Sequence, residues 1–157
     1  MPEIIYIETT IVSYLVAKPS RELILAAHQE VTREWSENQR PLYRCVTSQE
    51  TLLEASAGDE RMAASRIDAL KDLPVIELNA DIEETAISFL QTGAIPETMR
   101  PDAIHLAAAL HAGADYLLTW NCRHLTNAHV LRRLEREAVV RQWPLPTVCT
   151  PLELLAP

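Results

Sequence analysis

Glycine is scarce in this chain, and the glycine-rich motifs that hold phosphate groups in many enzymes are missing with it. Only 3 of the 157 residues are glycine, and no segment has the GxxxxGK[ST] or GxGxxG spacing. The patterns HExxH and GxSxG are absent as well. Phosphate-loop, dinucleotide-binding, zinc-protease and serine-hydrolase functions therefore have no support in the sequence.

Aromatic residues and long apolar runs are also few. Phe, Trp and Tyr make up 5% of the chain, which argues against a broad stacking platform for single-stranded nucleic acid. No stretch reaches the ~18 apolar residues of a membrane span, and the start, MPEIIYIETT, lacks the basic region of a signal peptide. The three cysteines are odd in number and widely spaced, which predicts reduced thiols in a cytoplasmic protein.

The charge is acidic overall but unevenly distributed. The net charge is −8, whereas residues 120–143 carry a net charge of +3 because five arginines outnumber two glutamates. A local basic stripe of this kind can hold a phosphate backbone. The same pattern also fits a solvated helix face with Arg–Glu pairs, and the sequence leaves both interpretations open.

Predicted strands and helices alternate along the chain. Apolar runs predict strands at 3–7, 42–46, 75–78, 115–119 and 146–149. Predicted helices separate them, beginning at Thr9 or Thr10, at Pro19-Ser20, at Thr47-Ser48, at Asp59, at Asn79 or Asp81, at Asp102 and at Asn127. This order predicts one domain, residues 1–157, with a three-layer α/β/α architecture and a central, mainly parallel sheet of four to five strands.

Four acidic or amide residues fall where the sites of such a sheet form, beyond the carboxyl ends of its strands. Glu8 follows the first strand, Asn121 follows the fourth, Asp102 opens a helix, and Glu54 lies about two turns into another. If the first and fourth strands are neighbours, the four side chains converge. We therefore predict that they form one site.

Each of the four has a plainer interpretation. Glu8 and Asp102 fit the first turn of a helix, where an acid is favourable, and Asn121 fits a turn after a strand. Glu54 could occupy a surface position on its helix. Glu50, one turn before Glu54, is its rival for the same role, although Glu54 is favoured. The prediction of a site therefore depends on four coincident placements rather than on any one residue.

Three carboxylates and one amide suit Mg²⁺ or Mn²⁺, because these ions prefer oxygen ligands. Carboxylates packed together without a cation would repel one another, and a divalent ion removes that cost. Such an ion also supports phosphodiester hydrolysis. Candidate contacts for a nucleic acid substrate are Arg123, His124, Arg132 and Arg133. His105 could also reach a phosphate, but it fits equally well as a residue that steadies Asp102 or as an ordinary half-buried histidine.

The pattern resembles the PIN domain, and especially the small ribonucleases of the VapC toxin type. The resemblance is carried by IYIETTIVSYL, VTSQETLLEASAGD, PDAIHLAAALHAGADYLLTWNCRHL and CTPLELL, which lie in order over nearly the whole chain. It implies a parallel α/β fold and an acidic cluster that binds Mg²⁺ or Mn²⁺ and hydrolyses RNA. It also implies a homodimer silenced by a cognate antitoxin.

Carried over by position, the resemblance makes Glu8, Glu54, Asp102 and Asn121 the catalytic and metal-binding residues. Two of them depart from the usual pattern, which has Asp at the first position and often at the fourth. The longer Glu8 and the neutral Asn121 leave a site with altered geometry and less negative charge. The leading hypothesis is a metal-dependent endoribonuclease of a type II toxin–antitoxin pair. A non-catalytic RNA- or protein-binding module with a weakened metal site is the alternative, and a metal-dependent phosphatase or DNA nuclease is a third.

Overall fold

The computed structural model describes all residues from 1 to 157 and shows strands alternating with helices. The strands are β1 (Ile4–Ile7), β2 (Arg44–Ser48), β3 (Val75–Ile76), β4 (Tyr116–Leu118) and β5 (Thr147–Cys149). The helices are α1 (Thr9–Val16), α2 (Leu23–Asn38), α3 (Gln49–Ala55), α4 (Glu60–Leu70), α5 (Ala80–Gln91), α6 (Arg100–His111) and α7 (Ala128–Arg141). Short 3₁₀ helices cover Arg40–Leu42, Glu97–Met99 and Pro151–Leu154. None of the helices has both the length and the apolar character needed to cross a lipid bilayer.

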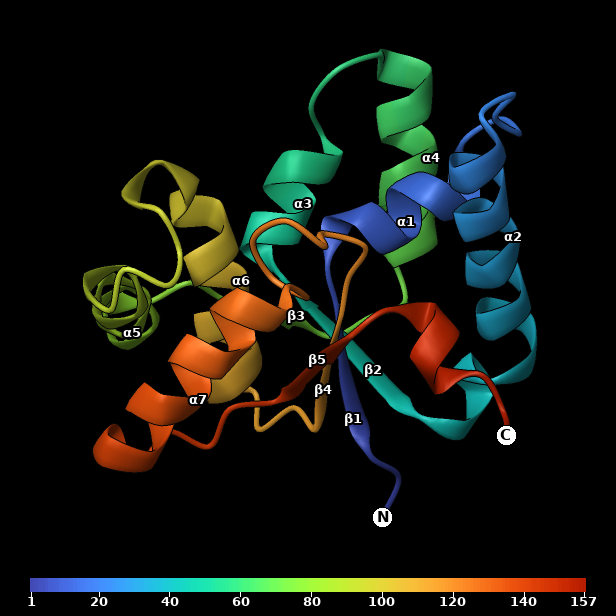
Figure 1. Ribbon diagram of the computed structural model, residues 1–157. Coiled ribbons are helices and arrows are strands. Elements are labelled where there is room, and N and C mark those ends of the chain that lie inside the picture. Colours follow the sequence, from blue (N-terminus) through green and yellow to red (C-terminus); the bar gives the residue numbers. More distant parts are fainter.

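The five strands form one parallel sheet in the order β3-β2-β1-β4-β5. The chain moves outward from β1 in one direction through β2 and β3, and in the other through β4 and β5. The order therefore reverses between β1 and β4, which are paired with Ile5 opposite Tyr116 and Ile7 opposite Leu118. Their carboxyl ends lie side by side at the edge of the sheet beside α1 and α3 (Figure 1), which is where α/β sheets form their sites.

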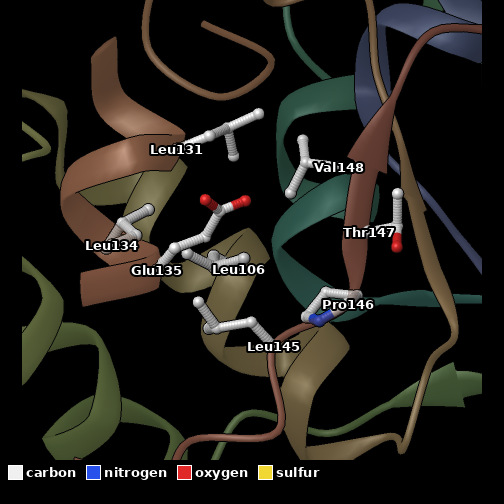
Figure 2. A pocket seen from close by; sticks show the side chains of 8 residues that line it. All are labelled: Leu106, Leu131, Leu134, Glu135, Leu145, Pro146, Thr147 and Val148. Carbon is white, nitrogen blue, oxygen red and sulfur yellow. The ribbon is translucent and has the colours of Figure 1, made fainter. Parts of the chain in front are cut away.

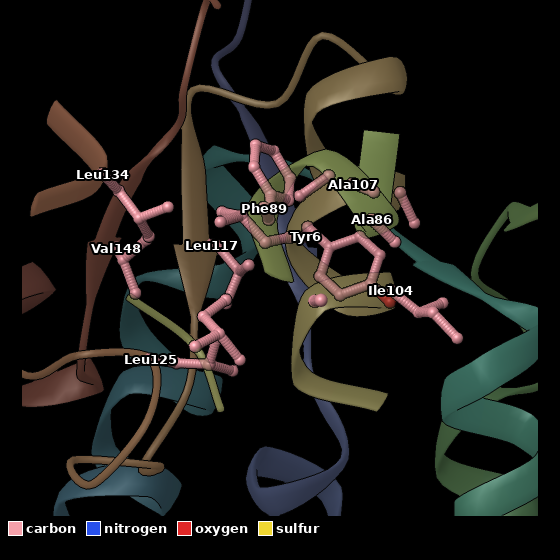
Figure 3. Close-up of a cluster of buried hydrophobic side chains, with 14 of the residues drawn as sticks. Tyr6, Ala86, Phe89, Ile104, Ala107, Leu117, Leu125, Leu134 and Val148 are labelled. Atoms are coloured by element: carbon pink, nitrogen blue, oxygen red, sulfur yellow. The ribbon is translucent and has the colours of Figure 1, made fainter. Parts of the chain in front are cut away.

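Two hydrophobic cores flank the sheet, because successive side chains of a strand point to opposite faces. On one face, Tyr6, Leu117 and Val148 pack against α5, α6 and α7, as Figure 3 shows. On the other face, Ile5 and Leu118 pack against residues of α1, α2, α3 and α4. The three-layer α/β/α prediction is confirmed, and every strand is parallel.

Most helix starts agree with the sequence prediction. Asp59, Asn79 and Asn127 each cap the helix that follows by accepting hydrogen bonds from backbone amides. Thr150 and Glu153 form a capping box at the start of the last 3₁₀ helix. All three cysteines are free thiols, with Cys45 and Cys149 buried and Cys122 exposed.

Several boundaries differ from the prediction, and helix α6 begins at Arg100, two residues before Asp102. The residue that caps α1 is Glu8, rather than Thr9 or Thr10, because its carboxylate reaches the amide of Thr10. Strand β2 begins two residues late because Arg40–Leu42 forms a 3₁₀ turn, and β3 contains only two residues.

Helix α2 begins at Leu23 rather than at Pro19-Ser20. The side chain of Gln29 accepts a hydrogen bond from the amide of Ser20 and donates one to the carbonyl of Lys18, which holds this segment outside the helix. Helical spacing of Ile24, Ala27, Val31 and Trp35 predicts one apolar face for this helix. In the structure, Trp35 is buried together with Gln29 and Thr32, whereas Ile24 is exposed.

Candidate metal centre

Glu8 combines a structural role with a place at the sheet edge. It follows β1 directly, its amide donates to the carbonyl of Leu118 in β4 at 3.2 Å, and only 4% of its surface is exposed. Its Oε2 accepts from the Thr10 amide at 3.0 Å, from the Thr10 hydroxyl and from the Thr119 hydroxyl at 2.8 Å. One oxygen of Glu8 is therefore held by three donors, while no hydrogen bond reaches Oε1.

Glu54 extends from the last turn of α3 toward the same edge. Its Oε1 accepts from the Thr9 hydroxyl at 2.8 Å and from Nε2 of His105. His105 is 1% exposed, and its other ring nitrogen, Nδ1, lies 2.8 Å from the hydroxyl of Tyr6. Glu54 thus resembles Glu8 in having one oxygen bound by internal donors and the other, Oε2, without a hydrogen bond.

Asp102 lies in the first turn of α6 and is held by the loop after β4. Its Oδ1 accepts from Nδ2 of Asn121 at 3.1 Å, while its Oδ2 is buried and has no hydrogen-bond partner. The ring nitrogen Nδ1 of His124 lies 3.3 Å from Oδ2. Asn121 forms two further hydrogen bonds. Its Oδ1 accepts from the backbone amide of His124, and its backbone amide donates to the Thr119 hydroxyl at 2.9 Å.

A series of hydrogen bonds connects Asp102 to Glu8. Asp102 contacts Asn121, Asn121 contacts Thr119, and Thr119 contacts Glu8. One ligand atom each from Glu8, Glu54 and His105 lie within 4.8 Å of one another. Asp102 and Asn121 stand beside this group of three rather than within it.

The pKa shifts report how burial and pairing compete at this site. Burial raises the pKa of Asp102, although the hydrogen bond from Asn121 and the two nearby histidines oppose the rise. Burial acts in the same direction on Glu54, but the hydrogen bonds from His105 and Thr9 outweigh it and lower the pKa of Glu54. Burial alone would lower the pKa of His105, yet its interactions with Tyr6, Glu54 and Glu8 raise it well above the ordinary value.

These residues fit a small divalent cation. Three carboxylates each have one oxygen fixed by donors from the protein and a second oxygen without such a donor, so each can act as a monodentate ligand. The buried and unpartnered Oδ2 of Asp102 in particular is costly without a counter-charge. Oxygen ligands that leave room for water suit Mg²⁺ or Mn²⁺.

The rival residue Glu50 is also near the site but is not a member of the cluster. It is 7% exposed, no hydrogen bond reaches its side chain, and burial raises its pKa. The cluster of possible ligands contains Glu54 instead, in line with the preference for Glu54 over Glu50 drawn from the sequence.

The five expected substrate contacts lie in different surroundings. Arg123 and Arg132 are exposed and form no ion pair, and His124 is half-buried beside Asp102. Arg133 is exposed but donates to the carbonyl of Gly93 at 3.4 Å, which directs it toward the end of α5. The expectation that His105 reaches a phosphate does not agree with the structure, because its ring is buried and both nitrogens are already bonded.

Sequence reasoning overlooked the hydroxyl groups that hold the carboxylates. Thr9, Thr10 and Thr119 all follow the ends of β1 and β4, the same places that singled out Glu8 and Asn121. Their position was therefore a usable signal. Tyr6 gave none, because a tyrosine in a buried strand is indistinguishable from an ordinary core residue in the sequence.

An apolar cavity of about 140 Å³ lies elsewhere, between α6, α7 and β5 (Figure 2). Its walls include Leu106, Leu134 and Val148, and Glu135 is the one acidic residue that lines it. None of the clustered carboxylates borders this cavity, so the cavity is separate from the candidate site at the sheet edge.

The pairing of Glu54 with His105 predicts a pH dependence of stability in the metal-free protein. The contribution of Glu54 is full above its ordinary pKa of 4.5 and is lost as the pH falls through its lowered value. The contribution of His105 is full below its ordinary pKa of 6.5 and is lost as the pH rises through its raised value. Both contributions are full between the two ordinary pKa values, 4.5 and 6.5. In denaturant titrations, we therefore expect His105→Gln to reduce the free energy of unfolding most in this pH range. A loss that is the same from pH 4 to pH 9 would contradict the pairing.

Comparisons with known proteins give structural matches but no sequence match. No protein-family model and no curated protein matches the chain. A toxin–antitoxin complex from Klebsiella pneumoniae aligns with a TM-score of 0.59 at 19% identity, covering 93% of this chain and 96% of the other. VapBC-1 from nontypeable Haemophilus influenzae aligns with a TM-score of 0.58 at 17% identity, covering 95% and 98%.

A third match comes from Mycobacterium tuberculosis. VapC20, a toxin that cleaves the sarcin-ricin loop, aligns with a TM-score of 0.57 at 20% identity, covering 72% of this chain and 86% of the other. At such identities, the agreement establishes the fold. The chain is therefore a PIN-like α/β/α domain with the fold of the VapC proteins.

Proposed function

We propose that this protein is a metal-dependent endoribonuclease, the toxin of a type II toxin–antitoxin pair. The observation that carries the proposal is the set of three carboxylates at the β1/β4 edge, each with one oxygen held by internal donors and one without. The VapC fold supports the same class of activity, because one protein with this fold cleaves the sarcin-ricin loop.

In this proposal, Glu8, Glu54 and Asp102 hold Mg²⁺ or Mn²⁺, directly or through water. A bound divalent ion supplies charge that polarises a phosphoryl oxygen and lowers the pKa of water. The protein contributes the fixed geometry: Thr10 and Thr119 hold Glu8, Thr9 holds Glu54, and Asn121 orients Asp102. Such preorganisation lets ligands meet the ion and the substrate without rearrangement.

The RNA backbone is proposed to pass over the loop after β4 and the exposed side of α7. Arg123 and Arg132 are exposed there and have no carboxylate partner, so their charge is available to phosphates. His124 follows Arg123 directly in the sequence and is half-buried beside Asp102. Arg133 is proposed to contribute more weakly because it also contacts Gly93.

The direct test is cleavage of RNA by protein purified free of contaminating nucleases, with Mn²⁺ or Mg²⁺ and with a chelator. We expect cleavage that requires the ion. Parallel incubations with single-stranded DNA and with a small phosphoester separate a ribonuclease from a DNA nuclease or a phosphatase. RNA that is bound but left intact would instead favour a non-catalytic binding module.

Removing one exposed arginine is expected to weaken RNA binding without changing sequence preference. Arg132→Ala should reduce affinity for all RNAs alike and make the slope of log K against log salt shallower by about 0.7, the value for one phosphate contact on a single strand. Arg33→Ala is the matched control, since Arg33 is paired with Glu30 on α2. Equal salt slopes in the parent and in Arg132→Ala would remove Arg132 from the proposed path.

The proposed partner is a cognate antitoxin, in keeping with the similar structures that are toxin–antitoxin or VapBC complexes. A small protein encoded next to this chain is expected to co-purify with it and to suppress cleavage. A homodimer in the cytoplasm is proposed as the working form, and light scattering of the purified chain gives its mass directly.

A further inference from the structure

A chain of hydrogen bonds runs from Glu54 into the interior of the protein. The Nε2 of His105 contacts Oε1 of Glu54, and Nδ1 lies 2.8 Å from the hydroxyl of Tyr6. The same hydroxyl lies 2.6 Å from the hydroxyl of Ser48 and 3.3 Å from that of Thr51. The chain therefore links α6, β1 and the start of α3, and it ends on a carboxylate of the proposed metal centre.

The surroundings of His105 leave its ring a single orientation. His105 is 1% exposed and Tyr6 is fully buried, and their rings meet edge to face with centroids 5.9 Å apart. Turning the imidazole would leave its two buried nitrogen atoms without their partners, which is unfavourable in a dry interior. The direction of the bond from His105 to Glu54 is thus set by the protein core.

This bond determines which oxygen of Glu54 is available. Oε1 meets His105 on one side and the Thr9 hydroxyl on the other, so Oε2 is the oxygen left for a ligand. Glutamate is a flexible side chain that loses considerable conformational freedom when it is fixed. Two donors that fix it in advance remove that loss from the binding step.

We infer that His105, anchored by Tyr6, is the positioning residue of the metal centre, orienting Glu54 so that Oε2 meets the ion while the imidazole itself stays outside its coordination. The inference rests on the proposed function and assigns a role to one more residue of the same site. His105 lies close enough to Glu8 and Glu54 to be considered a direct ligand. Direct ligation, however, would require its Nε2 to leave Glu54, with its other nitrogen already bound to Tyr6.

The test is the affinity of the full-length protein for Mn²⁺, measured by calorimetry without RNA. Loss of a partner that orients a metal ligand typically costs 10–100-fold in affinity, and we expect a reduction in that range for His105→Leu. His105→Gln keeps a donor amide and is expected to retain more affinity than His105→Leu. Tyr6→Phe removes only the anchor and is expected to fall between the parent and His105→Leu.

Leu106→Ala is the control for a general loss of stability, because Leu106 is buried on the same helix in the core away from the carboxylates. It should bind Mn²⁺ like the parent while unfolding more readily. If His105→Leu and Tyr6→Phe fold and bind Mn²⁺ as tightly as the parent, His105 is a core residue and the inference is wrong.

Pulsed electron paramagnetic resonance of the Mn²⁺ complex separates positioning from ligation. We expect no strongly coupled imidazole nitrogen, whereas such a coupling would make His105 a ligand and overturn the inference. Nuclear magnetic resonance of the metal-free protein supplies an independent readout. A slowly exchanging Nε2–H proton of His105 is expected in the parent, and it should exchange faster in Glu54→Ala.

Failure of the proposed function gives a different result. A parent protein that binds no Mn²⁺ but shows the protected Nε2–H proton would disprove the metal centre, and the inferred role with it, while the contact itself remained. A parent that binds Mn²⁺ with no response to the His105 and Tyr6 substitutions would disprove the inference alone.

Discussion

Asp102→Asn is expected to reduce RNA cleavage by about a hundredfold or more while the protein stays folded. The substitution removes the charge of the carboxylate whose buried Oδ2 has no hydrogen-bond partner. A metal ion contributes several kcal/mol to transition-state stabilisation, and each 1.36 kcal/mol corresponds to tenfold in rate. The hydrogen bond from Asn121 to Oδ1 can persist, because the new side chain keeps one carbonyl oxygen.

The same substitution is expected to raise the melting temperature of the metal-free protein. Burial raises the pKa of Asp102 above its ordinary value, so the ionised form is less favourable in the folded state than in the unfolded state. At neutral pH, the neutral amide removes that cost. A gain in stability together with a loss of activity is typical of residues kept for function rather than for folding.

Asp115→Asn is the matched control. Asp115 lies at the opposite end of β4, where its carboxylate accepts from the amide of Ile4 at 2.7 Å. It is expected to leave cleavage unchanged. Equal cleavage by the parent and by Asp102→Asn would exclude the carboxylate from the reaction.

Glu8 is expected to show two separable losses when it is replaced. Glu8→Ala removes the cap of α1 and leaves the fully buried hydroxyl of Thr119 without its acceptor. A lost cap costs about 1 kcal/mol, and an unsatisfied buried group costs a similar amount, so we expect destabilisation of roughly 2 kcal/mol. Cleavage should fall by about a hundredfold as well, because the ion loses a ligand.

Glu8→Gln separates the two effects. Its amide oxygen can still accept from Thr10 and Thr119, so stability is expected to change by less than about 1 kcal/mol, while cleavage falls nearly as far as in Glu8→Ala. Glu153→Gln changes the acid of another cap, far along the chain in the last 3₁₀ helix, and is expected to leave cleavage intact. Full activity in Glu8→Gln would reduce Glu8 to a capping residue.

The placement of the site was predictable because it follows from topology. Glu8 and Asn121 come directly after two strands, and the carboxyl ends of parallel neighbours meet at one edge. The sequence did not show that β1 and β4 are neighbours, and this is the pairing on which the prediction depended. The resemblance to PIN domains implied an acidic cluster, and the structure shows β1 paired with β4.

Other features could not be predicted because long-range contacts decide them. Pro19-Ser20 has the pattern of a helix start, but the side chain of Gln29, nine residues beyond Ser20, holds the segment apart from α2. His105 lies on an alanine-rich helix that is buried on nearly all sides. The spacing of apolar residues on this helix therefore does not predict which way the imidazole of His105 points. Its two partners, Tyr6 and Glu54, are 99 and 51 residues away in sequence.

The most direct measurement is anomalous diffraction from a crystal of the protein soaked in Mn²⁺. A peak coordinated by Glu8, Glu54 and Asp102, with His105 still bonded to Glu54, is what the carboxylate geometry predicts. An empty sheet edge at an ion concentration that supports RNA cleavage would contradict it, as would a peak bound only at some other surface.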